Sequence, residues 1–127
     1  MHRLTELFPR SPEEKPAATR VWISEAGEKW LDRLAPDEFM VKLERCAETG
    51  FGVFEGRGVV EPEWDGVWRF GIRDSTCRAL GFYEDEWKRS FVIIDVFKKK
   101  GQKLTVPERA RVTEVARVKR EGLYVRI

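Results

Sequence analysis

Lysines and arginines gather around the ends of three apolar segments in the second half of the chain. They are Arg69, Arg73, Arg78, Lys98, Lys99, Lys100 and Lys103. If the three segments are neighbouring strands, these side chains converge near one edge of a sheet. Grouped cations of this kind hold the phosphates of a nucleic acid, because charge attraction and hydrogen bonding act together.

Such a cluster can also cleave RNA. A lysine crowded by other cations has a lowered pKa, because each neighbouring positive charge disfavours its protonation, and it can then accept the proton of a ribose 2′-hydroxyl. An adjacent arginine stays charged and stabilises the pentacoordinate phosphate. Another cation protonates the leaving 5′-oxygen, so that the product ends in a 2′,3′-cyclic phosphate. The alternative is a solvated loop of lysines without chemistry.

The charges are divided unevenly along the chain. The formal net charge is +2, but residues 1–65 hold 14 Asp or Glu against 9 Lys or Arg. Residues 98–127 hold 10 Lys or Arg against 3 Asp or Glu. An acidic first half and a basic end predict one positive face, which would attract polyanions. A solvated arginine-rich helix that binds nothing explains the charge alone equally well.

Several familiar sites are excluded by the residue types. The sequence has no GxxxxGK[ST], HExxH or GxSxG pattern, and its only histidine is His2. Cys46 and Cys77 lie far apart without a CxxC pair, so we expect no metal site and no cofactor, and both thiols to be buried in a reducing cytoplasm. No apolar stretch approaches the roughly 20 residues of a membrane helix, and no secretory signal is recognised.

Three strands joined by short polar turns are expected to position the cations. Residues 67–73 alternate, with Trp68, Phe70 and Ile72 on one face and the arginines with Gly71 on the other. Residues 78–83 form the return strand and residues 90–97 the most apolar, central one. Because nothing helical separates them, the sequence predicts an antiparallel meander.

The remaining elements complete an α+β fold. Residues 20–24 are expected to be the first strand, residues 24–49 a helical hairpin broken at Pro36, and residues 105–122 the last helix. The order β-α-α-β-β-β-α predicts an antiparallel sheet packed against helices. Residues 1–18 hold three of the six prolines and are expected to be a flexible N-terminal extension of one domain, residues 19–127.

The stretches "WDGVWRFGIRD", "CRALGFY" and "FVIIDVFKKKGQKLTVPERARVTEVARVKR" in this order resemble the RelE/HigB-like toxins, in particular the phage-derived HigB-like subgroup of the RelE/ParE superfamily. The resemblance covers roughly residues 62–121. It implies a RelE-like sheet and the toxin of a type II toxin–antitoxin system. Such a toxin is typically an mRNA interferase, an endoribonuclease that acts on mRNA at the ribosome. A tightly bound antitoxin, here expected to be of the helix-turn-helix type, neutralises it.

The resemblance also implies roles for individual residues. By position, the catalytic residues of the family fall on Arg73 (or Arg69), Arg78, Lys99, Lys100 and Lys103. The lysines would be the base or phosphate ligands, and the arginines would stabilise the transition state. Further RNA contacts are expected from Arg69, Tyr83, Lys98 and Arg109.

Two of these positions allow more than one interpretation. Tyr83 could stack on a base, but it could equally be a half-buried residue of its strand. Asp95 stands where many members of the family have a histidine, so it could orient Lys99 or Arg78, or reduce activity.

Two other functions fit the same scaffold. The chain could be a non-catalytic inhibitor that binds a host protein such as gyrase or polymerase, and the apparent lack of a histidine or glutamate near the cations favours this alternative. It could also be an inactive relative retained in a prophage.

Overall fold

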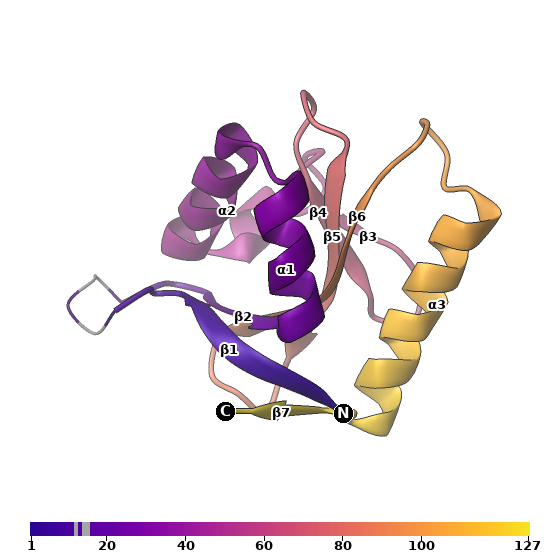
Figure 1. Ribbon diagram of the computed structural model, residues 1–127. Coiled ribbons are helices and arrows are strands. Elements are labelled where there is room, and N and C mark those ends of the chain that lie inside the picture. The colour runs from indigo at the N-terminus through magenta and orange to yellow at the C-terminus, as the bar shows by residue number, and fades with distance from the viewer. Residues whose placement is uncertain (12, 14–15) are drawn as a thin grey trace.

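The computed structural model describes residues 1–11, 13 and 16–127, which form a mixed seven-stranded sheet and three α-helices (Figure 1). The strands are β1 (His2–Phe8), β2 (Arg20–Ser24), β3 (Val60–Pro62), β4 (Trp68–Gly71), β5 (Cys77–Glu84), β6 (Ser90–Lys98) and β7 (Tyr124–Arg126). The helices are α1 (Glu25–Leu34), α2 (Asp37–Thr49) and α3 (Val106–Glu121), with a short 3₁₀ helix, η1 (Phe51–Phe54). The strand order across the sheet is β3-β4-β5-β6-β2-β1-β7.

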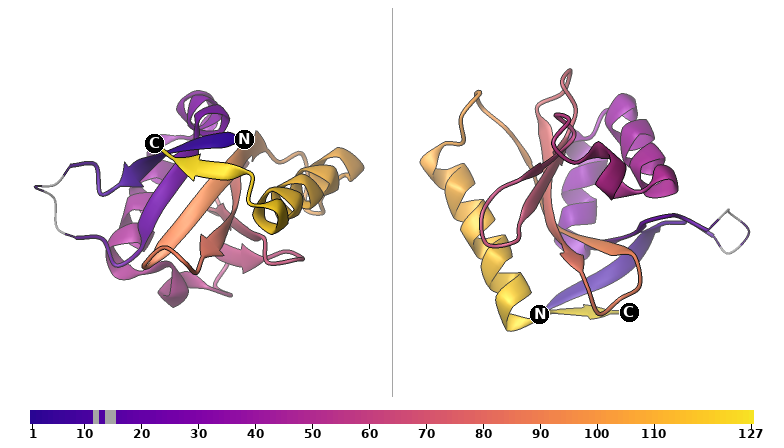
Figure 2. Two further views of the ribbon diagram at one scale, coloured as in Figure 1. Left: turned by 90° about the horizontal axis from the view of Figure 1, so that it is seen from below. Right: turned by 180° about the vertical axis from the view of Figure 1, so that it is seen from behind.

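Helices cover both faces of the sheet, so the protein has two apolar cores. Figure 2 shows the strands between α3 on one side and α1 with α2 on the other. The first core packs Leu31, Phe39 and Phe51 against the sheet, and the second packs Val112 and Val115 of α3. Burial of these side chains from water stabilises the layers. Among the described residues, no helix combines the length and apolarity needed to cross a membrane.

The predicted meander is confirmed. β4 and β5 pair antiparallel with Gly71 opposite Arg78, and β5 and β6 pair antiparallel with Cys77 opposite Lys98. The predicted helical hairpin is α1 and α2, and the predicted last helix is α3. The predicted α+β class is therefore correct.

The prediction of a purely antiparallel sheet is wrong, because two of the pairings are parallel. β2 lies parallel to β6, and β7 lies parallel to β1. The chain has to pass through α1, α2 and the β3–β5 segment before it returns as β6. This long connection allows the parallel pairing of β2 with β6.

The first residues also differ from the predicted flexible extension. His2–Phe8 is a strand, β1, that pairs with β2 and β7 and buries Leu4 and Phe8. The prolines on which the expectation rested come only after Phe8, so they do not interrupt the strand. Within the predicted extension, residues 12, 14 and 15 lie outside the described residues.

Glu108 fixes the connection between β6 and α3. Thr105 caps the helix and forms a capping box with this carboxylate, which accepts hydrogen bonds from the backbone N–H of Thr105 (2.8 Å) and of Lys100 (3.0 Å). Burial alone would raise the pKa of Glu108. The N–H donors and the charge of Lys99 outweigh burial and lower the pKa. The carboxylate therefore holds the segment that carries the lysines.

Replacing Glu108 by Ala should lower the free energy of unfolding by about 1–3 kcal/mol, because two backbone N–H groups lose their acceptor. The loss should be measured by urea unfolding, with Glu121→Ala as the control, since Glu121 forms an exposed ion pair with Arg117. The difference between parent and Glu108→Ala should shrink as the pH falls through the lowered pKa of Glu108. Equal losses in the two variants would contradict this account.

Candidate functional site

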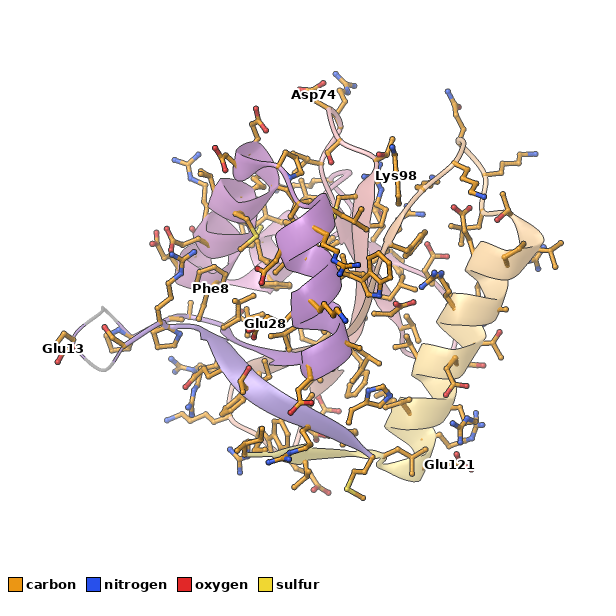
Figure 3. The ribbon with its side chains drawn as sticks, in the orientation of Figure 1. Phe8, Glu13, Glu28, Asp74, Lys98 and Glu121 are labelled. Carbon is orange, nitrogen blue, oxygen red and sulfur yellow. The ribbon has the colours of Figure 1, made fainter. Side chains whose placement is uncertain are left out.

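Cations from separate segments of the chain line one open depression of about 410 Å³. Its lining residues are Arg73, Asp74, Ser75, Thr76, Arg78, Lys99, Lys100, Gly101 and Gln102. They come from the β4–β5 loop, the start of β5 and the loop that follows β6. In Figure 3 the labelled Asp74 and Lys98 lie at the same end of the sheet, where these two loops leave it. We call this cavity the basic depression.

The β5–β6 pairing explains why these loops meet. Cys77 lies opposite Lys98, and one residue further the backbone N–H of Lys99 donates to the carbonyl of Thr76 (2.8 Å). Arg78, which follows Cys77, and Lys100, which follows Lys99, are therefore held at the same end of the ladder. Convergence of the cations follows from strand register and does not depend on the side chains attracting one another.

Arg78 is anchored by the backbone around it. Its Nη1 donates to the carbonyl oxygens of Ser75 (2.5 Å) and Cys77 (2.8 Å) and more weakly to that of Ile72 (3.4 Å). Burial and then the charge of Arg69 lower the pKa of Arg78, while Cys77 acts in the opposite sense. In the described residues its hydrogen bonds come from Nη1 alone.

Gly71 provides the space that Arg78 occupies. A Cβ atom at position 71 would lie 2.5 Å from Cδ and 2.7 Å from Nε of Arg78, closer than real contacts allow. The two residues face each other in the β4–β5 register. A larger residue here would displace the guanidinium without removing any charged group.

Lys99 is the cation best suited to lose its proton. Its Nζ donates to the carbonyl of Gln102 (2.7 Å). Burial lowers the pKa of Lys99, and so do the charges of Arg69 and Arg78, whereas Glu108 and Glu63 partly oppose the shift. A larger fraction of Lys99 is therefore neutral at a given pH than for an ordinary lysine.

The other predicted cations lie around the basic depression in different settings. Lys100 lines it, while Lys98, the last residue of β6, and Lys103, in the loop before α3, are exposed and do not line it. Arg69 is mostly buried and forms an ion pair with Glu63 (2.9 Å). Arg109 is exposed on α3, and its guanidinium lies over the ring of Trp64.

Two predicted residues are not brought to the cluster. Tyr83 is five residues further along β5 than Arg78, and its ring packs edge-on against Trp68 and Phe91. Its hydroxyl donates to Glu55, so it is the half-buried strand residue of the alternative interpretation. Asp95 accepts two hydrogen bonds from Arg111 and does not orient Lys99 or Arg78.

Sequence reasoning missed two carboxylates that act on Lys99. Glu63 and Glu108 both raise its pKa, which corrects the expectation that no glutamate lies near the cations. The capping pattern at Thr105 pointed to a fixed Glu108, but not to its hydrogen bond with the lysine loop. Glu63 lies in the β3–β4 loop, and nothing local in the sequence shows that it reaches Arg69.

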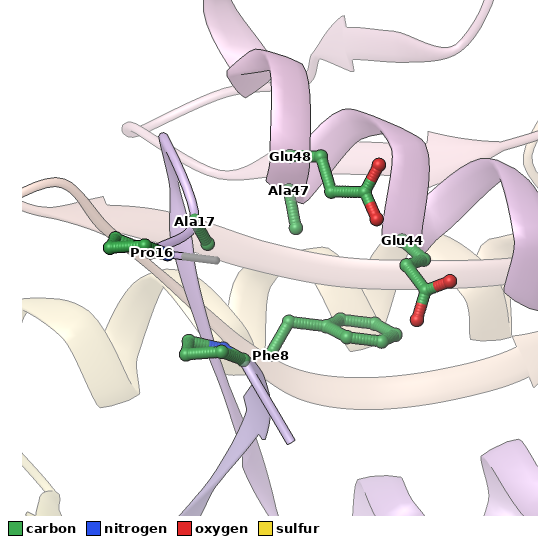
Figure 4. Close-up of a pocket in the computed structure, with 7 residues that line it drawn as sticks. Phe8, Pro16, Ala17, Glu44, Ala47 and Glu48 are labelled. Carbon is green, nitrogen blue, oxygen red and sulfur yellow. The ribbon is translucent and has the colours of Figure 1, made fainter. Parts of the chain in front are cut away.

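A second depression of about 460 Å³ lies between α2 and the end of β1. Figure 4 shows Glu44 and Glu48 on α2 beside Phe8, Pro16, Ala17 and Ala47. Carboxylates at this position would repel a phosphate, so this depression does not compete with the basic one for a polyanion. Within the described part of the chain, no group of three or more His, Cys, Asp or Glu could hold a metal ion.

The sequence matches no model of a known protein family, and a search of curated proteins found no relative.

Lys99 should titrate below the range of ordinary lysines, and Arg78→Gln should raise its pKa, because one nearby positive charge is removed. The pKa can be followed by NMR of side-chain-labelled lysine. Arg111→Gln is the matched control, since Arg111 pairs with Asp95. The electrostatic account would fail if both substitutions moved the Lys99 titration equally, or if neither did.

Proposed function

We propose that the protein is the toxin of a type II toxin–antitoxin system and acts as a metal-independent, ribosome-dependent mRNA endoribonuclease. The observation that carries the proposal is the basic depression, in which Arg73, Arg78, Lys99 and Lys100 line one space. A phosphodiester is the ligand whose charge and size suit several cations around an open cavity.

The proposed reaction uses each cation in one role. Neutral Lys99 accepts the proton of the ribose 2′-hydroxyl, and the 2′-oxygen attacks phosphorus. Arg73 and Arg78 stabilise the negative charge on the equatorial phosphate oxygens. The bond from phosphorus to the 5′-oxygen breaks, and the ammonium group of Lys100 donates the proton that the leaving oxygen needs. The products are a 2′,3′-cyclic phosphate and a free 5′-hydroxyl.

The toxin assignment rests on the order of sequence segments that resembles the RelE/HigB-like toxins. The element order β2, α1, α2, β4, β5, β6 and α3 follows the predicted order of elements and supports the proposal. β1, β3 and β7 are additional strands. We propose mRNA, the ribosome and a helix-turn-helix antitoxin as partners, with action in the cytoplasm.

The triple variant Arg73→Ala, Lys99→Ala, Lys100→Ala should abolish growth inhibition on induction and keep its thermal unfolding midpoint close to that of the parent, because the replaced side chains are at the surface. A control with the same change in charge is Lys29→Ala, Arg57→Ala, Lys88→Ala, whose sites lie outside the basic depression. Gly71→Ala tests geometry at constant charge and should also reduce inhibition. Full toxicity of the first triple variant would rule the site out.

The rate of RNA cleavage should rise with pH and level off below the range in which ordinary lysines titrate, because a lowered pKa makes Lys99 a base at lower pH. Arg78→Gln should move that inflection to higher pH in addition to slowing the reaction. The profile can be measured with purified protein, ribosomes and a defined mRNA. A rate that falls with pH over the same range would contradict the role of Lys99 as base.

A non-catalytic inhibitor of a host protein is the second candidate. The observation that favours it is the engagement of two cations: Arg69 is ion-paired with Glu63, and Lys99 is hydrogen-bonded to Gln102. Sequencing of RNA 5′ ends after induction separates the two functions, because new ends appear only if the protein cleaves RNA.

A further inference from the structure

We propose that single-stranded RNA leaves the basic depression along α3 and that one of its bases stacks on the Trp64–Arg109 pair, with Lys119 binding a flanking phosphate. The inference rests on the proposed function in taking RNA as the ligand, and it adds both a subsite and the single-stranded form of the substrate. The subsite lies between the β3–β4 loop and α3, and both Figure 1 and Figure 2 show this loop running toward the helix.

The Trp64–Arg109 pair places a guanidinium group over an aromatic ring. The guanidinium carbon of Arg109 lies 5.8 Å from the centre of the Trp64 ring. Trp64 is half-buried against the core beneath α3, whereas Arg109 is exposed. Bases stack on aromatic rings and on arginine planes alike, so a base placed on Arg109 would continue the stack.

Lys119 lies on the same side of α3 as Arg109, because both reach the β3–β4 loop. A Cβ atom at Gly66 would lie 2.7 Å from the Nζ of Lys119, so the ammonium group rests on the turn two residues after Trp64. Ten residues of helix separate Arg109 from Lys119, a rise of about 15 Å along the axis. Both side chains reach back to the same turn, so their charged ends lie on either side of residues 64–66.

The proposed subsite lies next to the basic depression. Trp64 directly follows Glu63, and Arg109 directly follows Glu108. Lys100, which lines the basic depression, donates its backbone N–H to Glu108 (3.0 Å), so the start of α3 with Arg109 lies beside the depression. A strand whose phosphate occupies the basic depression can reach the pair with a neighbouring nucleotide.

The charges of α3 favour this side of the helix over the other. Arg111 is paired with Asp95, and Arg117 is paired with both Glu114 and Glu121. In the described residues neither Arg109 nor Lys119 forms an ion pair. Unneutralised positive charge therefore runs beside the β3–β4 loop, as a polyanion requires.

A single strand fits this surface better than a duplex. Stacking on Arg109 needs a base with a free face, and the bases of a helical duplex are already stacked on both sides. We expect the subsite to accept any of the RNA bases, because every base has a face that can stack.

The test measures binding of a fluorescein-labelled 12-nucleotide 2′-O-methyl RNA, which lacks the attacking hydroxyl and cannot be cleaved. Arg109→Lys keeps the charge and removes the planar surface, so it should weaken binding at least about fivefold with an unchanged salt dependence. Arg109→Gln should weaken binding further and reduce the salt slope by about one. Arg33→Lys is the matched control, because Arg33 lies over Trp30 on α1 in a similar pair (5.4 Å).

The results separate this inference from the proposed function. The subsite would be supported if Arg109→Lys binds the RNA more weakly than the parent protein and Arg33→Lys binds it as tightly as the parent. The parent should also prefer the single strand over the same sequence in a duplex. Unchanged binding by Arg109→Lys, or equal affinity for the duplex, would overturn it even if the parent protein cleaves RNA. If the parent protein binds the single-stranded RNA in this way but does not cleave the same oligonucleotide with 2′-hydroxyl groups on ribosomes, the proposed nuclease activity is wrong and the subsite remains.

Discussion

The antiparallel pairing of β5 with β6 is the constraint on which the candidate site depends. It sets Cys77 opposite Lys98 and continues into the hydrogen bond from Lys99 to Thr76. The strands themselves are fixed by apolar side chains that are buried on both faces of the sheet, such as Phe82 and Ile93. A shift of one residue would move each of these side chains into the other core, where it would meet different neighbours, so close packing opposes such a shift. The position of the cations follows from the register.

Burial in the cores compensates for a local electrostatic cost. The charge of Arg69 adds to the effect of burial in lowering the pKa of Arg78, and the charges of Arg69 and Arg78 do the same for Lys99. Such proximity of like charges is unfavourable. Glu63 and Glu108 reduce this repulsion, one through an ion pair with Arg69 and the other by holding the lysine loop. The cluster remains positive overall and contains one lysine, Lys99, whose pKa is lowered. Either phosphate binding or proton transfer can use this arrangement.

Much of the fold could be predicted because its signals are local. Alternation in residues 67–73, the apolar run of 90–97 and the capping box at Thr105 each identify an element from neighbouring residues. The strand β1 was not predicted, because Pro9 and Pro16, which follow it, are typical of an irregular segment. Leu4 and Phe8 gave only a weak strand pattern. Parallel pairing could not be predicted either, since it depends on how distant segments meet.

The candidate site was only partly predictable for the same reason. Arg73, Arg78, Lys99 and Lys100 flank consecutive strands, and a meander brings such residues together whatever their exact partners are. Glu63 and Trp64 come from a loop with no regular pattern, and their contacts with Arg69 and Arg109 exist only in the folded chain. Tyr83 was assigned to RNA because of its residue type. Its place at the far end of β5 argues against this role.

The most direct test of the central claim is an NMR titration of arginine and lysine side chains with a dinucleotide that has a 2′-deoxyribose at its 5′ residue and cannot be cleaved. If one site holds the phosphodiester, the signals of Arg73, Arg78 and Lys99 should shift together with a single dissociation constant, and those of Arg117 should stay unchanged. Separate constants for these residues, or shifts no larger than those of Arg117, would contradict a shared phosphate site.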